Sequence, residues 1–316
     1  MTTYIIRRVL ISILVVFIVS VFSFSLMHLM PGDPARLALG YEASEADVQA
    51  LRVTYNLDKP VLEQYIIWIK NLFKGELGDS VIHKRPVADM IRERLPRTFS
   101  IGVCALIVGV PIGILFGILC AVKRGKFADQ IITFFMTVIM GMPVFWLGIL
   151  LILVFAVKMK VLPIQGYTPP STNFAEFLYK ATLPTIAMSL GMSAGLCRQT
   201  RTNMLDSINQ DYIRTARANG LSEGSVVYKH ALKNALIPVI TIVGMQVRVV
   251  IGGSLLVEQL FNIPGLGTLL TTALNNRDYM IVQTCTLLIS LFTVGANLLV
   301  DIAYGIVDPR IRKQRR

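Results

Sequence analysis

Six long apolar segments constrain this chain more than any other feature of its sequence. A bilayer core about 30 Å thick needs about 20 consecutive apolar residues, because a helix rises about 1.5 Å per residue. The 316-residue chain is 54% hydrophobic and only 16% charged, against roughly 45–50% apolar residues in soluble domains. The sequence therefore predicts an all-α polytopic membrane protein with six transmembrane helices, at 9–29, 98–122, 131–157, 183–197, 236–260 and 281–307.

The net positive charge is concentrated on one side of these segments. The net charge is +12, and 16 of the 31 Lys and Arg residues fall in the N-terminus, 123–129, 198–235 and 308–316. The long segment 31–97 carries ten basic and ten acidic residues. This pattern predicts a multi-pass protein of the bacterial cytoplasmic (inner) membrane with both termini in the cytoplasm and membrane lipid around it. It does not indicate nucleic-acid binding, because no aromatic residues are interleaved with a basic face.

The same segments predict how the chain is divided. We expect an N-terminal transmembrane anchor at 1–30, an extracytoplasmic segment at 31–95, a five-helix membrane domain at 96–307 and a basic cytoplasmic tail at 308–316. In the extracytoplasmic segment, "VLEQYIIWIKNLF" places Leu62, Tyr65, Ile69 and Phe73 on one face of an amphipathic helix. That helix would belong to a small cap that folds on itself or lies at the lipid surface. The alternative is that it forms a docking surface for an outside partner.

Small residues and proline predict how the membrane helices pack. Gly109, Gly113 and Gly117 recur every four residues, as do Gly191 and Gly195, and this spacing lets helix backbones approach closely in lipid. Two further positions are candidates for a transport pathway. Pro143, in "GMPVF", predicts a kink at mid-membrane, and Arg248 places a charge within an apolar segment, where it must be paired or wet.

Catalytic and metal-binding patterns are few. "GMSAG" at 191–195 matches G-x-S-x-G around Ser193, which leaves an intramembrane serine hydrolase as an alternative of a different class, although a membrane helix is the wrong context for a nucleophile elbow. The four cysteines contain no Cys-x-x-Cys pair, so neither a disulfide framework nor a metal site is predicted. A G-x-x-x-x-G-K-[ST] loop is missing too, so any nucleotide must bind another chain.

A basic segment between the fourth and fifth apolar segments has the features of a helical hairpin. Asp206 or Ser207 can cap a helix, Gly220 can end it in the left-handed conformation, and Ser222 can cap the next helix. Exposed basic residues accompany an apolar and small-residue patch that a solvated loop would not need. The patch consists of Tyr212, Ile213, Ala216 and Leu221.

At this hairpin the sequence resembles the inner-membrane permeases of binding-protein-dependent ATP-binding-cassette (ABC) importers, in their peptide and nickel branch. Gly220 matches the glycine of that family's cytoplasmic "EAA" loop and Ala216 its second alanine. Arg214 stands in place of the glutamate, Thr215 in place of the first alanine, and the closing proline comes five residues late, at Pro238. The resemblance covers nearly the whole chain, through the blocks "MPGDPARLALG" at 30, "YNLDKP" at 55, "RPVADMI" at 85, "HALKNALIPVIT" at 230, "NIPGLGTLL" at 262 and "DPRIR" at 308.

The resemblance implies a type I ABC importer transmembrane domain and a transport subunit rather than an enzyme, with no catalytic residue on this chain. It implies a second homologous permease subunit, two cytoplasmic ATP-binding subunits that hold ATP and Mg, and an extracytoplasmic solute-binding protein. Di- or oligopeptides, including glutathione-like ones, are the expected solutes, and nickel or a metal chelate is the alternative. The residues expected to couple this chain to an ATPase are Asp211, Tyr212, Arg214, Ala216, Arg217, Gly220 and Leu221.

Overall fold

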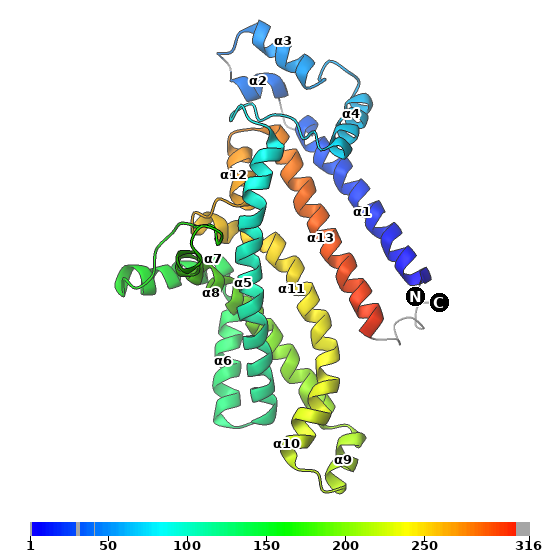
Figure 1. The fold of residues 1–316 in the computed structure, drawn as a ribbon, viewed down its shortest axis with the longest axis vertical. Coiled ribbons are helices and arrows are strands. Elements are labelled where there is room, and N and C mark those ends of the chain that lie inside the picture. The colour runs from blue at the N-terminus through cyan, green and yellow to red at the C-terminus, as the bar shows by residue number, and fades with distance from the viewer. Residues whose placement is uncertain (1, 30–31, 41, 308–316) are drawn as a thin grey trace. The chain divides into compact units, whose positions relative to one another are not determined.

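The computed structural model describes residues 2–29, 32–40 and 42–307, without the side chains at 2–3, 26–27, 34, 38, 237, 241, 248–249, 251–253 and 303–307. Within these residues the chain is helical and forms no β-strand, as predicted, and a single isolated bridge joins Asp79 to Pro86. In chain order (Figure 1), the helices and π-helical turns are α1 (Thr2–Leu29), α2 (Pro34–Leu39), α3 (Glu45–Thr54), α4 (Val61–Lys74), α5 (Val87–Val122), α6 (Phe127–Gly141), α7 (Val144–Leu151), η1 (Ile152–Lys158), α8 (Phe174–Ile208), α9 (Asp211–Ala218), α10 (Glu223–Ser225), η2 (Val226–Ala231), α11 (Leu232–Leu260), α12 (Leu266–Asn275) and α13 (Tyr279–Val307).

The chain forms two compact units, each built from segments far apart in the sequence. Unit 1 is drawn from Met1–Arg8, Phe99–Ile263 and Ala296–Arg316, and unit 2 from Val9–Thr98 and Pro264–Gly295. The helices α1, α5 and α13 each contribute to both units.

Helix α8 is the centre of unit 1. Its first turn is capped by Asn173, whose side chain accepts a hydrogen bond from the backbone NH of Glu176 at 3.1 Å. Along its length α8 packs against α6, α7 and α11, and fifteen of its 35 side chains are buried. Four of these are Ser or Thr and one is Pro184. A helix covered by protein rather than lipid can carry such residues.

The composition of α8 also explains why the prediction of six transmembrane helices is not confirmed. Among the described residues, three helices are long and apolar enough to span a membrane, at Tyr4–Ser25, Val87–Val122 and Tyr279–Ile302. The number rises to five if each of two sharply bent helix pairs is one span. The predicted segment 183–197 lies inside α8, which is not among these candidates because small and polar residues lower its hydropathy.

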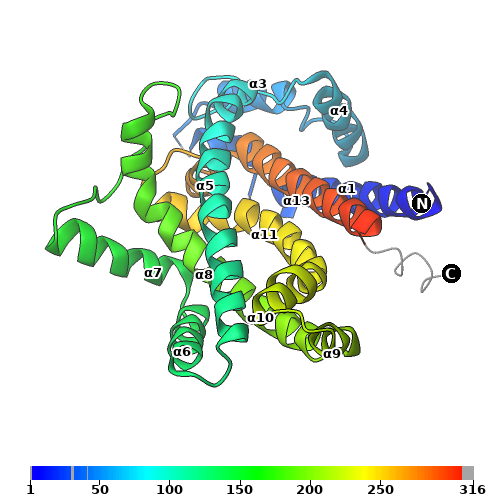
Figure 2. The ribbon, with the colours of Figure 1, turned by 60° about the horizontal axis from the view of Figure 1, so that its bottom comes forward.

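The kink predicted at Pro143 is confirmed, and it is a full break in the helix. Helix α6 ends at Gly141 and α7 begins at Val144, with their pair bent by 109°. Pro143 precedes α7 in an extended conformation, with φ −61° and ψ 141°, because its ring cannot continue the hydrogen-bond ladder of α6. Figures 1 and 2 show α7 leaving α6 at a steep angle.

Unit 2 contains the short helices α2, α3 and α4, and it corrects the predicted apolar face of α4. Tyr65, Trp68 and Ile69 of α4 pack with Phe24 of α1 and Leu287 of α13. Leu62 and Phe73, which we expected on the same face, are 71% and 86% exposed. The helix therefore buries a face centred on Trp68 and leaves a second set of apolar residues uncovered.

Candidate functional site

The candidate site in unit 1 is the hairpin between α8 and α11, in which α9 and α10 lie beyond the end of α11 (Figures 1 and 2). The prediction that Asp206 or Ser207 starts its first helix is wrong, because α8 continues to Ile208 and α9 begins only at Asp211. Leu205 and Ile208 pack against a buried cluster around Met204. Burial of these two side chains extends α8 past both potential caps.

Gly220 forms the turn between the two helices, as predicted. Its φ is +78°, in the left-handed region. The backbone NH of Gly220 donates to the carbonyl of Arg217 at 2.9 Å, and that of Leu221 donates to the carbonyl of Ala216 at 3.3 Å. These two bonds define a Schellman motif, which satisfies the last carbonyls of α9.

Two side chains close the hairpin on the far side of this turn. Ser222 caps α10 as predicted, accepting a hydrogen bond from the backbone NH of Ser225 at 3.5 Å. Arg217 binds both carboxylate oxygens of Glu223, at 2.7 and 3.3 Å, and this bond raises the pKa of the Arg217 guanidinium. The hairpin is therefore a folded element rather than a loop.

The hairpin has a small core of its own, which corrects the expected exposed patch. Ile213 and Ala216 of α9 are buried against Val226 and Ala231 of η2, and Ala216 is only 8% exposed. Tyr212 and Leu221 remain exposed at 40% and 42%. Asp211, Arg214, Arg217 and Gly220 are also exposed. Of the seven residues predicted for coupling, all but Ala216 therefore reach the surface.

The base of the hairpin is attached firmly to the rest of unit 1. Val227 of η2 joins a buried cluster with Ala121 of α5, Met204 of α8 and Ala235 of α11. The directions of α9 and α10 are therefore tied to the packing of three long helices. A displacement of the hairpin would be transmitted to those helices.

An ion pair that the sequence did not predict joins α6 to α8 in the same unit. The guanidinium of Arg201 binds Asp129 through two bonds of 2.8 and 2.9 Å. Asp129 is buried and also accepts bonds from the backbone NH of Gly125 and the hydroxyl of Thr133. An acidic residue in the first turn of α6 was the only local signal, and it does not identify a partner 72 residues away.

Close packing of α5 on α8 follows the glycine spacing of α5. A Cβ at Gly113 would lie 2.6 Å from the Cβ of Leu196 and 2.9 Å from the carbonyl oxygen of Ser193. The approach allows the hydroxyls of Ser189 and Ser193 to donate to the carbonyls of Ala105 and Gly109, at 3.0 and 2.9 Å. The glycines of α5 therefore pack as predicted.

The two glycines of α8, Gly191 and Gly195, do not pack as predicted. A Cβ at Gly191 or Gly195 would meet no other described atom of the chain within 4 Å, because the serines of α8 face α5 instead. Ser193 is buried within a long helix, with its hydroxyl bonded to a backbone carbonyl. It lacks the strand-turn-helix setting of a nucleophile elbow, and nothing supports the hydrolase alternative.

Of the two predicted pathway residues, the structure describes Pro143 fully and Arg248 only by its backbone. Pro143 is exposed between α6 and α7. Arg248 belongs to α11, but its side chain lies outside what the structure describes. Among the described residues, no group of three or more His, Cys, Asp or Glu could hold a metal ion.

Comparison with known families agrees with this architecture. Residues 113–313 match the family "Binding-protein-dependent transport system inner membrane component", and residues 1–102 match the N-terminal region of such membrane components. The first match covers more than half of the chain, so the protein belongs to this family. It is a transport component rather than an enzyme.

Similar proteins cover the chain from end to end. It is 40% identical to a probable peptide ABC transporter permease protein, y4tP, of Sinorhizobium fredii, over 99% of this chain and all of that protein. It is 41% identical to the oligopeptide transport system permease protein AppB of Bacillus subtilis, over 98% and 99% of the two chains. Identity to the glutathione transport system permease protein GsiC of Pectobacterium atrosepticum is 40%, over 99% of each.

Solved structures show the same fold at much lower identity. An amino acid ABC transporter crystallised with histidines has a TM-score of 0.55 and 16% identity, covering 69% of this chain and 94% of that one. The inward-facing MetNI methionine ABC transporter has a TM-score of 0.53 and 17% identity, covering 70% and 96%. These matches establish the type I ABC importer transmembrane fold.

Proposed function

We propose that this chain is one of two homologous membrane subunits of an ATP-driven importer of short peptides, and that the hairpin docks on a cytoplasmic ATPase. Peptide, oligopeptide and glutathione appear in the names of its full-length relatives, which favours peptides over nickel or a metal chelate. An extracytoplasmic solute-binding protein would deliver the peptide. The chain carries no phosphate-binding loop, so ATP and Mg would be held by two partner ATPase subunits.

The orientation follows from the basic residues. The hairpin segment 198–235 carries six Lys and Arg residues and only three acidic ones, while 31–97 is balanced. The positive-inside rule therefore places the hairpin and both termini in the cytoplasm of a bacterial cell.

The observation that carries this proposal is the construction of the hairpin. It buries Ile213 and Ala216 to hold itself together and exposes Tyr212 and Leu221, with Arg214 beside them. Aromatic, aliphatic and arginine side chains of this kind dominate protein interfaces. Closure of the ATPases on ATP would move the hairpin, and its rigid base would pass the movement to α5, α8 and α11.

The test separates the surface of the hairpin from its core. Leu221→Arg and Tyr212→Ala should abolish co-purification of the ATPases and peptide uptake while the membrane subunits still assemble. Leu221→Met and Tyr212→Phe, which retain the apolar area, should behave as wild type. ATPase retention by Leu221→Arg and Tyr212→Ala would show that this surface meets only water.

Ala216→Arg tests the core in the same assay. Ala216 is buried, so a long charged side chain there would unfold the hairpin itself. Loss of ATPase binding in Ala216→Arg alone, with the two surface variants unaffected, would therefore count against docking through Tyr212 and Leu221.

The translocation pathway is a second part of the proposal. The break between α6 and α7 puts irregular backbone next to Pro143, and in a membrane such backbone is tolerated where it is covered by protein or lines a water-filled cavity. Arg248 would face the same interior, because a charge on a lipid-facing side of α11 would be costly.

A further inference from the structure

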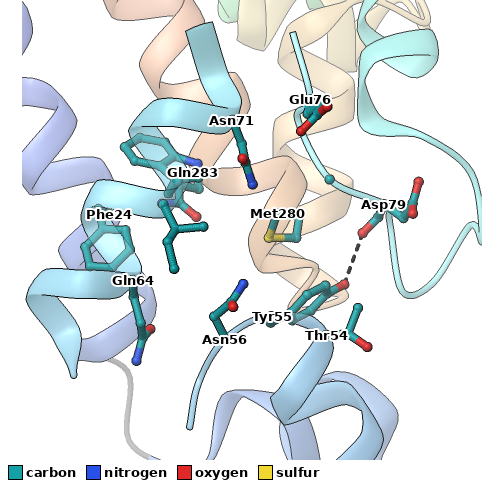
Figure 3. A pocket seen from close by; sticks show the side chains of 13 residues that line it. Phe24, Thr54, Tyr55, Asn56, Gln64, Asn71, Glu76, Asp79, Met280 and Gln283 are labelled. Carbon is teal, nitrogen blue, oxygen red and sulfur yellow. Dashed lines mark hydrogen bonds between the residues drawn. The ribbon is translucent and has the colours of Figure 1, made fainter. Parts of the chain in front are cut away.

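Unit 2 contains a pocket of ≈ 300 Å³ that the transport mechanism above does not use. Its walls come from α4, from the segments on either side of α4 and from the first turns of α13 (Figure 3). The volume suits one amino-acid residue with its neighbouring peptide group, at the small end of the range for ligand pockets.

The floor of the pocket carries a buried hydrogen-bond donor. Gln283 is only 3% exposed, and its Nε2 has no hydrogen-bond partner among the described residues. The backbone at this position is fixed, because the hydroxyl of Ser23 donates to the carbonyl of Gln283 at 2.8 Å. Buried amide groups are nearly always paired, so this donor is available to an acceptor that a ligand supplies.

Gln64, the other buried glutamine that lines the pocket, has its side-chain amide hydrogen-bonded to neighbouring groups. The Nε2 of Gln64 donates to the carbonyl of Lys59 at 2.8 Å, and its Oε1 lies 3.1 Å from the Nε2 of His28. Gln64 is therefore part of the wall. The Nε2 of Gln283 has no such partner among the described residues.

The remaining wall is partly polar, and Tyr55 is held in place by a hydrogen bond. The hydroxyl of Tyr55 donates to the carbonyl of Asp79 at 3.0 Å. Burial, with the nearby Asp278 and Asp79, raises the pKa of Tyr55, so the phenol stays neutral. Asn56 adopts a left-handed conformation at φ +56°, and Figure 3 shows its amide and that of Asn71 pointing toward each other across the pocket.

The charge of the pocket selects among ligands. Among the described residues that line it there is no Lys, Arg or His, and the charged ones are Glu76 and Asp79. In Figure 3 the carboxylate of Asp79 points away from the pocket, whereas Glu76 lies at its edge. Trp68 adds an aromatic ring. A carboxylate and an aromatic ring favour a cation, and an anion would have no countercharge.

We propose that this pocket binds the amino-terminal residue of a short peptide, with its ammonium group near Glu76 and its first carbonyl accepting a hydrogen bond from Gln283. Every peptide amino terminus carries both an ammonium group and a carbonyl, the two kinds of group that Glu76 and Gln283 can bind. The assignment rests on the peptide function proposed above, and adds a binding site on this chain that works without the solute-binding protein.

The experiment uses the complete membrane complex in lipid nanodiscs, with the solute-binding protein left out. Isotopically labelled trialanine is the probe, and equilibrium dialysis measures its dissociation constant. Gln283→Met keeps the side-chain length and removes the donor, and should weaken binding about tenfold. Glu76→Gln should weaken it by a similar factor, and N-acetyl-trialanine should compete at least ten times more poorly than trialanine.

Matched variants control for the substitutions themselves. Glu63→Gln and Gln49→Met make the same changes in unit 2 at exposed residues that do not line the pocket, and both should leave the dissociation constant unchanged. Glu76 is exposed, so Glu76→Gln tests the proposal even if Gln283→Met fails to assemble. Equal binding of trialanine by wild type, Gln283→Met and Glu76→Gln, or equal competition by the acetylated peptide, would overturn it.

Uptake of trialanine into proteoliposomes, with the solute-binding protein restored, separates the two proposals. Uptake by wild type together with binding that ignores Gln283 and Glu76 would leave the importer standing and remove the pocket. Binding that depends on both residues, without uptake of any peptide, would support the pocket and refute peptide import.

Discussion

Gly113→Ala in α5 should destabilise the protein by an amount that the packing of α5 on α8 allows us to work out. The new Cβ would lie 2.6 Å from the Cβ of Leu196, and ordinary contact begins at 3.4 Å. The helices must therefore separate by about 0.8 Å at this point, since both obstructing groups are fixed to the backbone. Overpacking of this kind costs about 1–3 kcal/mol.

The separation also strains two interhelical hydrogen bonds. The hydroxyls of Ser189 and Ser193 donate to carbonyls of α5 at 3.0 and 2.9 Å, and an added 0.8 Å would take both beyond hydrogen-bonding range. Such bonds contribute about 0.6 kcal/mol each in membranes. The unfolding free energy should therefore fall by about 2–4 kcal/mol.

The assay is reversible unfolding of the purified chain in mixed micelles with increasing SDS, followed by circular dichroism. Gly195→Ala is the matched control, because the added Cβ would meet no other described atom within 4 Å, and alanine favours a helix by up to about 1 kcal/mol over glycine. Wild-type stability in Gly113→Ala, or an equal loss in Gly195→Ala, would refute the reasoning.

Three further predictions test other parts of the structure. Ser193→Ala should leave peptide uptake nearly intact and cost less than about 1 kcal/mol in the same unfolding assay, since it removes one interhelical bond; a hydrolytic activity lost in this variant would contradict us. Asp129→Asn should cost about 1–3 kcal/mol, because it leaves the Arg201 guanidinium without its charged partner, whereas Glu223→Gln, in an exposed pair, should cost less than about 1 kcal/mol; equal losses would contradict this. Arg248→Ala should lower uptake while the membrane subunits still co-purify, and failure to co-purify would make Arg248 a structural residue.

Composition and hydropathy were enough to predict the all-helical membrane architecture, because lipid-facing helices must be apolar over their whole length. For α8 they predicted only a short segment, 183–197, inside a helix of 35 residues. Fifteen side chains of this helix are buried, and the Ser, Thr and Gly residues along it lower its hydropathy. A helix that packs mainly against other helices therefore gives a weaker hydropathy signal than a lipid-facing one.

Local sequence patterns predicted the turn and the cap of the hairpin correctly, but they did not predict which faces of the helices are buried. Gly220 and Ser222 act as predicted, because helix capping depends on neighbours within a few residues. The three glycines of α5 and the two of α8 share one spacing, yet only those of α5 meet a neighbouring helix. Ala216 was expected at the surface and is buried by η2. Which face of a helix is covered depends on long-range packing, which spacing alone does not encode.

Gly220 offers the most direct test of the hairpin as a coupling element. Its φ of +78° is a conformation that a β-branched residue adopts at a cost of about 1–3 kcal/mol. A valine there would therefore break the Schellman motif, releasing the bonds that Gly220 and Leu221 donate to the end of α9. Gly220→Val should misdirect α9 without disturbing the long helices, because no other atom lies within 4 Å of the added Cβ among the described residues.

The controls isolate backbone conformation from side-chain size. Gly220→Asn should retain function, since asparagine tolerates the left-handed region. Gly224→Val adds the same side chain in α10, where the Cβ also has open space and φ is not positive. We expect Gly220→Val to assemble with its membrane partner, to lose the ATPases on purification and to lose uptake, while both controls keep them. Retention of the ATPases by Gly220→Val would show that the direction of α9 does not matter for docking, and the hairpin would then have to act through η2 and α11 alone.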